Sequence, residues 1–264
     1  MRIAQLSDLH LTGDARPLYG AIDTEAAFVA ALAALRDLQR RGIALDLVLL
    51  TGDLASQGDP AAYQRLCQAL AALPWPCAVL PGNHDDRVQL RRFFPQQTWS
   101  AGVLACATVD LAAGRILLLD SSVSGQTAGE VTAAHCNWLE SVSDGRPALL
   151  ALHHPPFTLG LPALDAISCA GGELLACWLA RHPEVAAVLC GHAHRSVSTL
   201  FAGRPAVVAP SIAHQIAWQP EAAPDALAFQ LEPGAFLIHD WRPPLPPITH
   251  RLPLSAPLPV AYPD

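Results

Sequence analysis

Five short apolar segments recur along the chain, and each ends abruptly at a cluster of Asp, Asn or His residues. Each segment is only four or five residues long. Continuous apolar runs of this length are typical of strands that are buried on both faces. The five predicted strands are Ile3–Leu6, Leu47–Leu50, Cys77–Leu80, Ala148–Leu152 and Ala186–Cys190.

Helical patterns occupy the stretches between these segments. From Thr24, which can cap a helix, apolar residues recur at helical spacing until Gly42, where we expect the helix to end. Pro60 stands where the first residue of a second helix would be. The same spacing appears in Thr132–Val142 and Gly172–His182. This alternation of strands and helices predicts a layered α/β fold with parallel strand pairs.

Other apolar segments predict antiparallel structure. Val103–Val109 and Arg115–Asp120 are joined by a short Ala-Ala-Gly connection, which indicates a hairpin. Beyond Pro205, turn residues separate further strand-like segments, so we expect the carboxyl third to be antiparallel β. These later segments are Ala206–Ala209, Ala228–Leu231 and Ala235–Trp241.

The last residues differ in composition from the rest. Eight of the 24 prolines follow Arg242. Proline disfavours helix, so we expect residues 243–264 to form an extended tail, packed on or extending from a single domain of residues 1–242.

Composition narrows the class of protein. With 52% apolar and 15% charged residues, the chain is typical of a globular protein with a large core. No apolar run approaches the 20 or so residues of a membrane span, and the first ten residues lack a signal-peptide pattern, so we expect a soluble cytoplasmic protein. Seven cysteines without a Cys-x-x-Cys pair indicate reduced, mostly buried thiols.

Charge argues against a nucleic-acid partner. The net charge is −7, and all sixteen basic residues are arginine. A chain without a dense basic face is poorly suited to bind a long phosphate backbone. Small substrates therefore fit this composition better, with neither long nucleic acid nor membrane as a partner.

The polar clusters carry the candidate chemistry. Ligands of open α/β sheets bind beyond the carboxyl ends of the strands, where all five clusters would meet. Taken singly, each cluster is as easily a solvated loop or a turn. Their joint placement at five strand ends predicts a metal site. The residues gathered there are Asp8, His10, Asp53, Asn83, His84, His153, His154, His192 and His194.

The residue types specify the metal chemistry. Two carboxylates, one amide and four imidazoles form a mixed nitrogen and oxygen set without thiolate, which suits Mn, Fe, Zn, Co or Ni. Seven ligands are too many for one tetrahedral ion, so we expect two ions. A pair of divalent ions outweighs two carboxylates in charge, and such a cationic pocket suits an anionic phosphoryl group.

The ordered motifs DLH, GD, GNHD, HHPP and GHAH resemble those of the calcineurin-like metallophosphoesterases, over residues 3 to about 195. More narrowly, HHPPFTLGLPALDAISC followed by LCGHAHR is similar to bacterial class III cyclic-nucleotide phosphodiesterases and to glycerophosphodiesterases. The resemblance implies a four-layer α/β fold, with a central β-sandwich of mixed sheets flanked by helices. It also implies a metal-dependent phosphodiesterase in which metal-bound hydroxide attacks a 3′,5′-cyclic nucleotide or, as the alternative, a glycerophosphodiester.

The same resemblance assigns the metal ligands. Two ions would share the carboxylate of Asp53. The other implied ligands are Asp8, His10 and His194 for one ion, and Asn83, His153 and His192 for the other.

Further roles follow for neighbouring residues. The resemblance implies that His84 is catalytic, by hydrogen bonding to a phosphoryl oxygen or by protonating the leaving group. Asp85 would orient His84 or a ligand, and His154 would stand behind the ligands. Arg195 and Arg87 are candidates to contact substrate phosphate, although we favour exposed, solubilising roles for both.

Two residues outside the motifs stay open. His214, near Pro210 and Ser211, is a weaker candidate for the site. Asp120 ends the hairpin strand and could buttress the site or cap a turn, and we favour the turn. Competing functions are a phosphomonoesterase, a non-catalytic scaffold and a nuclease. A monoesterase would ordinarily use an Arg or Lys clamp, a scaffold would be expected to lose ligands, and the acidic charge opposes a nuclease. The chain could also form a homo-oligomer through its carboxyl third.

Overall fold

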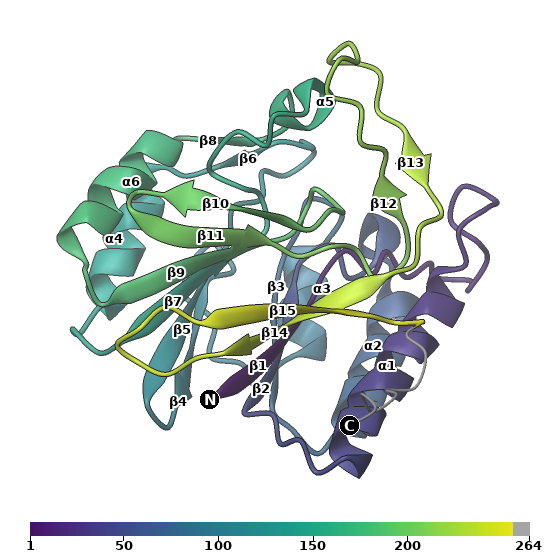
Figure 1. The fold of residues 1–264 in the computed structure, drawn as a ribbon, viewed down its shortest axis with the longest axis horizontal. Helices are drawn as coiled ribbons and strands as arrows, with labels where there is room; N and C mark the ends of the chain where they lie inside the picture. The colour runs from purple at the N-terminus through teal and green to yellow at the C-terminus, as the bar shows by residue number, and fades with distance from the viewer. Residues whose placement is uncertain (256–264) are drawn as a thin grey trace, which may run out of the picture.

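The computed structural model describes residues 1–255 and contains two large β-sheets (Figure 1). The first sheet has the strand order β15-β14-β1-β2-β3. In it β1, β2 and β3 are parallel, whereas β14 runs antiparallel to both β1 and β15. Its strands are β1 (Arg2–Leu6), β2 (Leu47–Thr51), β3 (Cys77–Leu80), β14 (Ala235–Asp240) and β15 (Ile248–Pro253).

The second sheet has six strands in the order β10-β11-β9-β7-β5-β4. The central strands β5, β7, β9 and β11 are parallel, and the outer strands β4 and β10 run antiparallel to their neighbours. Its strands are β4 (Ala107–Leu111), β5 (Gly114–Leu119), β7 (Ala148–Leu152), β9 (Val185–Cys190), β10 (Val197–Phe201) and β11 (Arg204–Val208).

The two sheets pack face to face through an apolar core. Leu47 and Leu49 of β2 contribute to this inner core together with Leu149 of β7 and Leu189 of β9. Successive side chains of a strand point to opposite faces. Val48 and Leu50 of β2 therefore pack on the other face, under the helices. Burial on both faces explains why the predicted strands are continuously apolar.

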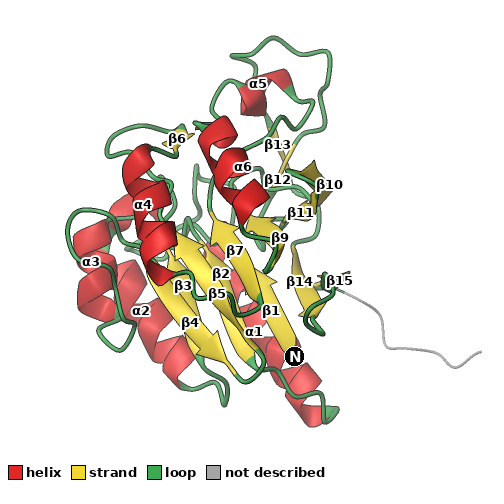
Figure 2. Ribbon diagram, turned by 90° about the vertical axis from the view of Figure 1, so that its left-hand side faces the viewer, coloured by secondary structure: helices red, strands yellow, loops and turns green. Residues whose placement is uncertain are grey.

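Helices cover the outer face of each sheet (Figures 1 and 2). Helices α1 to α3 lie on the first sheet, and α4 and α6 lie on the second. The result is the four-layer α/β sandwich that the sequence predicts. The helices are α1 (Thr24–Arg40), α2 (Pro60–Ala71), α3 (Arg87–Phe93), α4 (Ala133–Val142), the short α5 (Pro162–Asp165) and α6 (Gly172–Arg181), with a 3-10 turn at Ser56–Gly58.

The start of α1 differs by one residue from the prediction. The cap is Asp23, whose carboxylate accepts a hydrogen bond from the backbone N–H of Ala26 at 2.8 Å. Thr24 is buried as the first helical residue and does not cap the helix. The other end is as expected, since Gly42 adopts a φ of +72°, a conformation that favours glycine.

The predicted hairpin exists, with β4 beginning four residues later than expected. Residues 103–106 lie outside the strand, and β4 pairs with β5 from Ala107 to Leu111. The expectation of an antiparallel carboxyl third is wrong for one strand, because β11 runs parallel to β9. After β9 the chain reverses direction to form the edge strand β10. It reverses again to form β11, which therefore runs in the same direction as β9 and pairs with it.

Part of the proline-rich tail is an edge strand. Residues 248–253 form β15, which pairs with β14 throughout, so this stretch belongs to the same sheet as β1. Residues 256–264 of the predicted tail lie outside the described residues. Two small sheets complete the fold, β6 (Gly129–Glu130) with β8 (Cys169–Ala170) and β12 (Gln215–Ile216) with β13 (Phe229–Gln230). Among residues 1–255, no helix combines the length and apolarity required to cross a membrane.

Candidate metal centre

The loops after β1, β2 and β9 meet at one edge of the sandwich. The backbone N–H of Asp8 donates to the carbonyl of Gly52 at 3.1 Å, and that of His10 donates to the carbonyl of Asp53 at 2.9 Å. Asp8, His10 and Asp53 all have positive φ angles, which non-glycine residues rarely adopt. His192 shares this property. Such strained residues are held by their surroundings and concentrate at functional sites.

One buried cluster consists of Asp8, His10, Asp53 and His194. One potential ligand atom from each residue lies within 4.8 Å of the others. The Nε2 atoms of His10 and His194 are 3.0 Å apart. His10 Nε2 is 3.5 Å from an Asp53 oxygen, and His194 Nε2 is 3.4 Å from an Asp8 oxygen. These four residues could hold a metal ion, and they are the set that the family resemblance implies for one ion.

A second buried cluster of His153, His154 and His192 adjoins the first. His153 Nε2 lies 3.4 Å from Oδ2 of Asp53 and 3.9 Å from Oδ1 of Asp8. The Asp53 carboxylate therefore stands between His10 on one side and His153 on the other.

Backbone carbonyls select which nitrogen of each ring can bind a cation. His153 Nδ1 donates to the carbonyl of Thr51 at 2.7 Å, so Nε2 is the nitrogen left to bind either a proton or a cation. His194 is oriented in the same way, by a 3.2 Å bond from Nδ1 to the carbonyl of His214. His192 is the reverse, because its Nε2 donates to a carbonyl at 3.1 Å and its Nδ1 stays free. Such bonds fix the tautomer of metal-binding histidines.

His154 differs because both of its ring nitrogens are engaged. Nε2 donates to the carbonyl of Thr127 at 3.1 Å, and Nδ1 lies 2.9 Å from the hydroxyl of Ser121. That hydroxyl oxygen accepts the backbone N–H of His154, so its own proton goes to Nδ1. The ring has no free lone pair to offer, and this agrees with its predicted place behind the ligands.

Several buried acceptors here lack a hydrogen-bond partner within residues 1–255. They include Asn83 Oδ1 and His153 Nε2. An unpaired buried polar atom is costly, and a cation would satisfy both. The donor set therefore fits metal ions.

Buried charges interact strongly in these clusters. Although burial opposes ionisation, His194 lowers the pKa of Asp8 to about 2. Burial likewise opposes a charge on His153, but Asp53 outweighs it and raises the pKa of His153 to about 9. For His192, burial and then the charge of His153 lower the pKa to about 4. The carboxylates thus attract positive charge into a region that excludes water.

A cavity of about 270 Å³ opens onto the first cluster. Its floor includes His10, Asp53, Asn83 and His84. The backbone N–H of His84 donates to Asp53 Oδ1 at 2.9 Å, and its ring meets the His10 ring edge-on at a centroid distance of 4.7 Å. His84 is only half-buried, so its side chain can reach a molecule in the cavity.

Comparison with known proteins supports the predicted resemblance. The family model for calcineurin-like phosphoesterases matches residues 1–196. The chain belongs to this family. A glycerophosphodiester phosphodiesterase of Enterobacter lignolyticus is 34% identical over 223 residues, which cover 82% of this chain and 79% of the relative. A 3′,5′-cyclic adenosine monophosphate phosphodiesterase of Escherichia coli K12 is also 34% identical, over 80% of this chain and 76% of its own.

Solved structures share the fold of this phosphoesterase. A dimetal phosphatase from Danio rerio superposes with a TM-score of 0.63 at 14% identity, covering 94% of this chain and 98% of that one. At this identity the likeness concerns the architecture alone, and it agrees with the four-layer sandwich described above.

Asp85 was expected to orient His84 or a ligand, and its hydrogen bonds go to the backbone beside two predicted ligands. Its carboxylate accepts backbone N–H groups of Leu54, Ala55 and Gly82, and the hydroxyl of Tyr63 at 2.8 Å. Burial, followed by the charge of Asp53, raises its pKa to about 6. Asp85 thus ties the loop that carries Asp53 to the turn that carries Asn83.

Neither candidate arginine is among the residues that line the cavity. Arg195 donates to the carbonyl of Ile216 at 2.5 Å and lies 3.5 Å from Glu232. Arg87 forms an ion pair with Asp120, whose side chain is fully buried. The expectation that both arginines are exposed is wrong, since their side chains are 23% and 17% exposed. Asp120 does accept the backbone N–H of Ser122, as a turn cap would, but its main partner is Arg87.

Three residues that line the cavity were not predicted from the sequence, or only weakly. His214 is buried against His194, with ring centroids 4.4 Å apart, and it lines the cavity. Tyr19 and Phe229 also line it, on segments far apart in sequence. The only signal for His214 was its position near Pro210 and Ser211 in the family pattern. Nothing in the sequence pattern distinguishes Tyr19 or Phe229 from ordinary surface aromatics.

Proposed function

We propose that this phosphoesterase hydrolyses small phosphodiesters with two metal ions, and that 3′,5′-cyclic nucleotides are its preferred substrates. The observation that carries the proposal is the pair of adjoining buried clusters at the floor of one cavity. Relatives named as a cyclic AMP phosphodiesterase and a glycerophosphodiester phosphodiesterase, each 34% identical, support a diester substrate. The second of these makes glycerophosphodiesters the alternative substrate class.

The proposed ligand sets share Asp53. Its carboxylate lies 3.5 Å from His10 Nε2 and 3.4 Å from His153 Nε2, as a bridge between two ions would. Nitrogen and oxygen donors without thiolate favour Mn, Fe, Zn or Co. The remaining ligands are Asp8, His10 and His194 for one ion, and Asn83, His153 and His192 for the other.

Two ions held by these residues would supply positive charge for the phosphoryl group and would lower the pKa of a bound water. The chain itself positions the substrate. We assign the catalytic role to His84, whose ring faces the cavity beside His10. Its N–H donates to a phosphoryl oxygen, or transfers its proton to the leaving oxygen. Carbonyls of Thr51 and His214 hold two ligand rings in position, and Asp85 holds the Asp53 loop.

The lining of the cavity favours diesters over monoesters. Among the described residues, no arginine lines it, and the sequence has no lysine. A dianionic monoester ordinarily recruits such a clamp, whereas a diester carries a single negative charge.

The test compares kcat/KM for cyclic AMP, a glycerophosphodiester, bis(4-nitrophenyl) phosphate and 4-nitrophenyl phosphate, with metal content measured on the same sample. We expect two metal ions per chain, hydrolysis of the diesters, and the highest kcat/KM for cyclic AMP. A strong preference for the monoester would contradict the proposal, as would a folded protein that binds no metal when Mn or Zn is supplied.

A further inference from the structure

The cavity has two chemically distinct walls. The ligand residues form its polar floor, whereas the rest of its lining is mostly apolar and comes from the loop before α1, the α5 region and the β12–β13 region. Leu164 and Ile167 belong to α5 and the turn after it, and Ile216 and Leu227 belong to the β12–β13 region. A substrate bound at the floor would therefore place its leaving group against aliphatic side chains.

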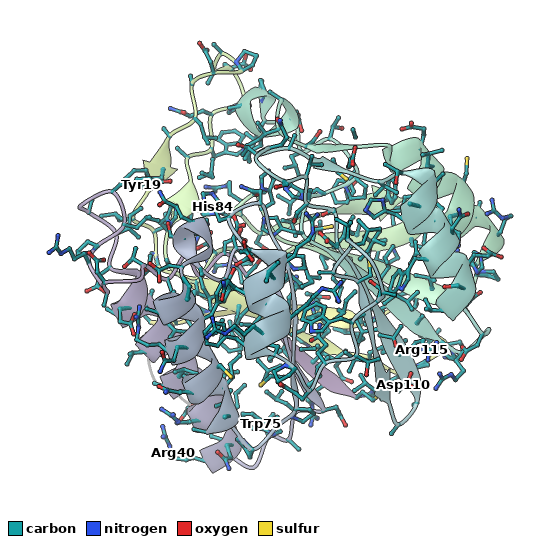
Figure 3. The ribbon with its side chains drawn as sticks, turned by 180° about the vertical axis from the view of Figure 1, so that it is seen from behind. Tyr19, Arg40, Trp75, His84, Asp110 and Arg115 are labelled. Carbon is teal, nitrogen blue, oxygen red and sulfur yellow. The ribbon has the colours of Figure 1, made fainter. Side chains whose placement is uncertain are left out.

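Two aromatic rings stand at the mouth of the cavity. Tyr19, in the loop before α1, and Phe229, on β13, have ring centroids 6.4 Å apart and planes inclined by 30°. Tyr19 is 70% exposed and Phe229 is 40% exposed. Figure 3 shows Tyr19 on its outer loop, at the same end of the molecule as His84.

The aromatic pair is connected to the candidate metal centre through His214. The His214 ring meets Phe229 edge-on at 5.6 Å and, on its other side, lies 4.4 Å from the His194 ring. One side chain, His214, therefore separates the aromatic pair from the ligand His194.

The loop holds Tyr19 in place by a closed turn. Leu18 and Ile22 exchange two backbone hydrogen bonds, of 2.8 and 3.0 Å. Tyr19 and Gly20 both have positive φ angles within this turn. The Tyr19 ring is therefore presented by fixed backbone hydrogen bonds, although most of it faces water.

We propose that Tyr19 and Phe229 clamp the flat ring of a nucleobase, and that this clamp selects nucleoside cyclic phosphates over glycerophosphodiesters; the inference rests on the function proposed above. Carbon atoms in contact lie about 3.5–4.0 Å apart, so a planar base needs roughly 7–8 Å between two rings. The two rings stack on each other with centroids 6.4 Å apart and planes inclined by 30°, so the exposed Tyr19 ring has to turn parallel to Phe229 and move outward before a base fits between them.

A glycerol group gains less from this wall. Its hydroxyls would face Leu164, Ile167 and Leu227, which offer no hydrogen bond. A polar group that loses water without gaining a partner is penalised. A base, in contrast, presents its apolar faces to the rings and keeps its polar edges toward the open mouth.

The kinetic test uses two diesters that share a six-membered cyclic phosphate: cyclic AMP, and the base-free cyclic phosphate of 1,3-propanediol. Stacking of a base on protein aromatics changes affinity by roughly 5- to 150-fold. We expect Tyr19→Leu and Phe229→Leu to lower kcat/KM for cyclic AMP by this factor, mainly through KM, and to leave the base-free diester within about twofold of wild type. Equal losses on both substrates, or no loss on either, would overturn the clamp.

Matched controls separate the rings from their surroundings. Tyr19→Phe keeps the ring, and we expect it to keep the cyclic AMP activity. Leu231→Ala alters an exposed residue just beyond β13 that does not line the cavity, and we expect no effect. A loss of cyclic AMP activity in either control variant would contradict the clamp.

A second measurement does not depend on catalysis. AMP is added to the metal-free protein, and the adenine H2 and H8 resonances are followed by NMR. Between two rings these protons shift upfield, and the shift should be absent in Tyr19→Leu and Phe229→Leu. No shift in wild type refutes the clamp, even if the diesters are hydrolysed. A shift in a protein that hydrolyses neither diester refutes the proposed function and leaves the clamp standing.

Discussion

At the scale of single residues, hydrogen bonds to carbonyls decide which histidines can bind metal. His153 and His154 are adjacent and both are buried, yet only His153 keeps a nitrogen without a hydrogen-bond partner. The resemblance to known phosphoesterases already favoured His153 as the ligand. The bonds of His154 to Ser121 and Thr127 give a physical reason for that choice.

This difference predicts distinct metal contents for two neighbouring substitutions. His153→Ala should lower the bound metal from about two ions per chain toward one, because it removes a ligand. His154→Ala should keep both ions and lose mainly stability, since it leaves the hydroxyl proton of Ser121 without its acceptor. Elemental analysis of the purified variants checks this. Loss of an ion from His154→Ala alone would reverse the assignment.

A separate prediction concerns His84. Its backbone, not its ring, bonds Asp53, so His84→Ala should leave the ligands in place. We expect kcat for a diester to fall by roughly 10²- to 10⁴-fold, the usual contribution of a general acid, with the metal content unchanged. The exposed His250 provides a control, and His250→Ala should behave as wild type. A kcat for His84→Ala within a few-fold of wild type would rule out the catalytic role.

At the scale of elements, an ion pair joins α3 to the end of β5. Arg87 begins α3, directly after the turn that carries Asn83 and His84, and Asp120 follows β5. The carboxylate of Asp120 bonds the guanidinium twice and also accepts the backbone N–H of Ala105. Because Asp120 is fully buried, Arg87 is its necessary counter-charge.

Breaking this pair should be costly. Arg87→Ala leaves a buried carboxylate unpaired, which ordinarily lowers the free energy of unfolding by about 3–5 kcal/mol. Urea denaturation measures the change. Arg242→Ala removes an exposed ion pair with Asp240 and should change stability by less than about 1 kcal/mol. Equal effects from Arg87→Ala and Arg242→Ala would show that the buried pair has no special role.

At the scale of the whole molecule, a series of buried hydrogen bonds runs across the first sheet and joins it to the second. His239 on β14 bonds Thr249 on β15 at 2.8 Å and Gln5 on β1 at 2.9 Å. Gln5 in turn donates to Thr51 on β2 and to the carbonyl of Cys190 in the second sheet. Burial lowers the pKa of His239 to about 3, so the folded protein holds this ring neutral.

The sign of the resulting pH dependence follows from this shift. In the unfolded chain a histidine takes up a proton near pH 6.5, whereas folded His239 does so only near pH 3. The contribution of His239 to the free energy of unfolding is therefore fully present above pH 6.5, and it is lost as the pH falls from 6.5 toward 3. Its contribution to the slope approaches about 1.4 kcal/mol per pH unit.

Urea denaturation between pH 7 and pH 5 tests the role of His239. His239→Gln should be less stable at pH 7 but should lose less stability on acidification than wild type. The exposed residue His250 on β15 provides the comparison, and His250→Gln should retain the wild-type slope. An unchanged slope in His239→Gln would contradict the assignment of a neutral buried ring.

The fold was largely predictable because its signals are local. Apolar runs such as Leu47–Leu50 mark strands buried on both faces, and helical spacing marks the helices between them. Errors occurred where a local signal was ambiguous or absent. Asp23 and Thr24 are adjacent potential caps, and only the backbone angles decide between them. Parallel pairing of β11 with β9 depends on where the chain returns after β10.

The sequence by itself determined which side chains gather at the candidate metal centre. Each follows its strand by a few residues, and parallel strands place these ends at one edge of the fold, so spacing along the chain was enough. Only the tertiary structure decided the partner of Arg87, the free nitrogen of each histidine and the aromatic pair of Tyr19 and Phe229. These features depend on contacts between residues that are distant in sequence, where no short-range pattern records which groups meet.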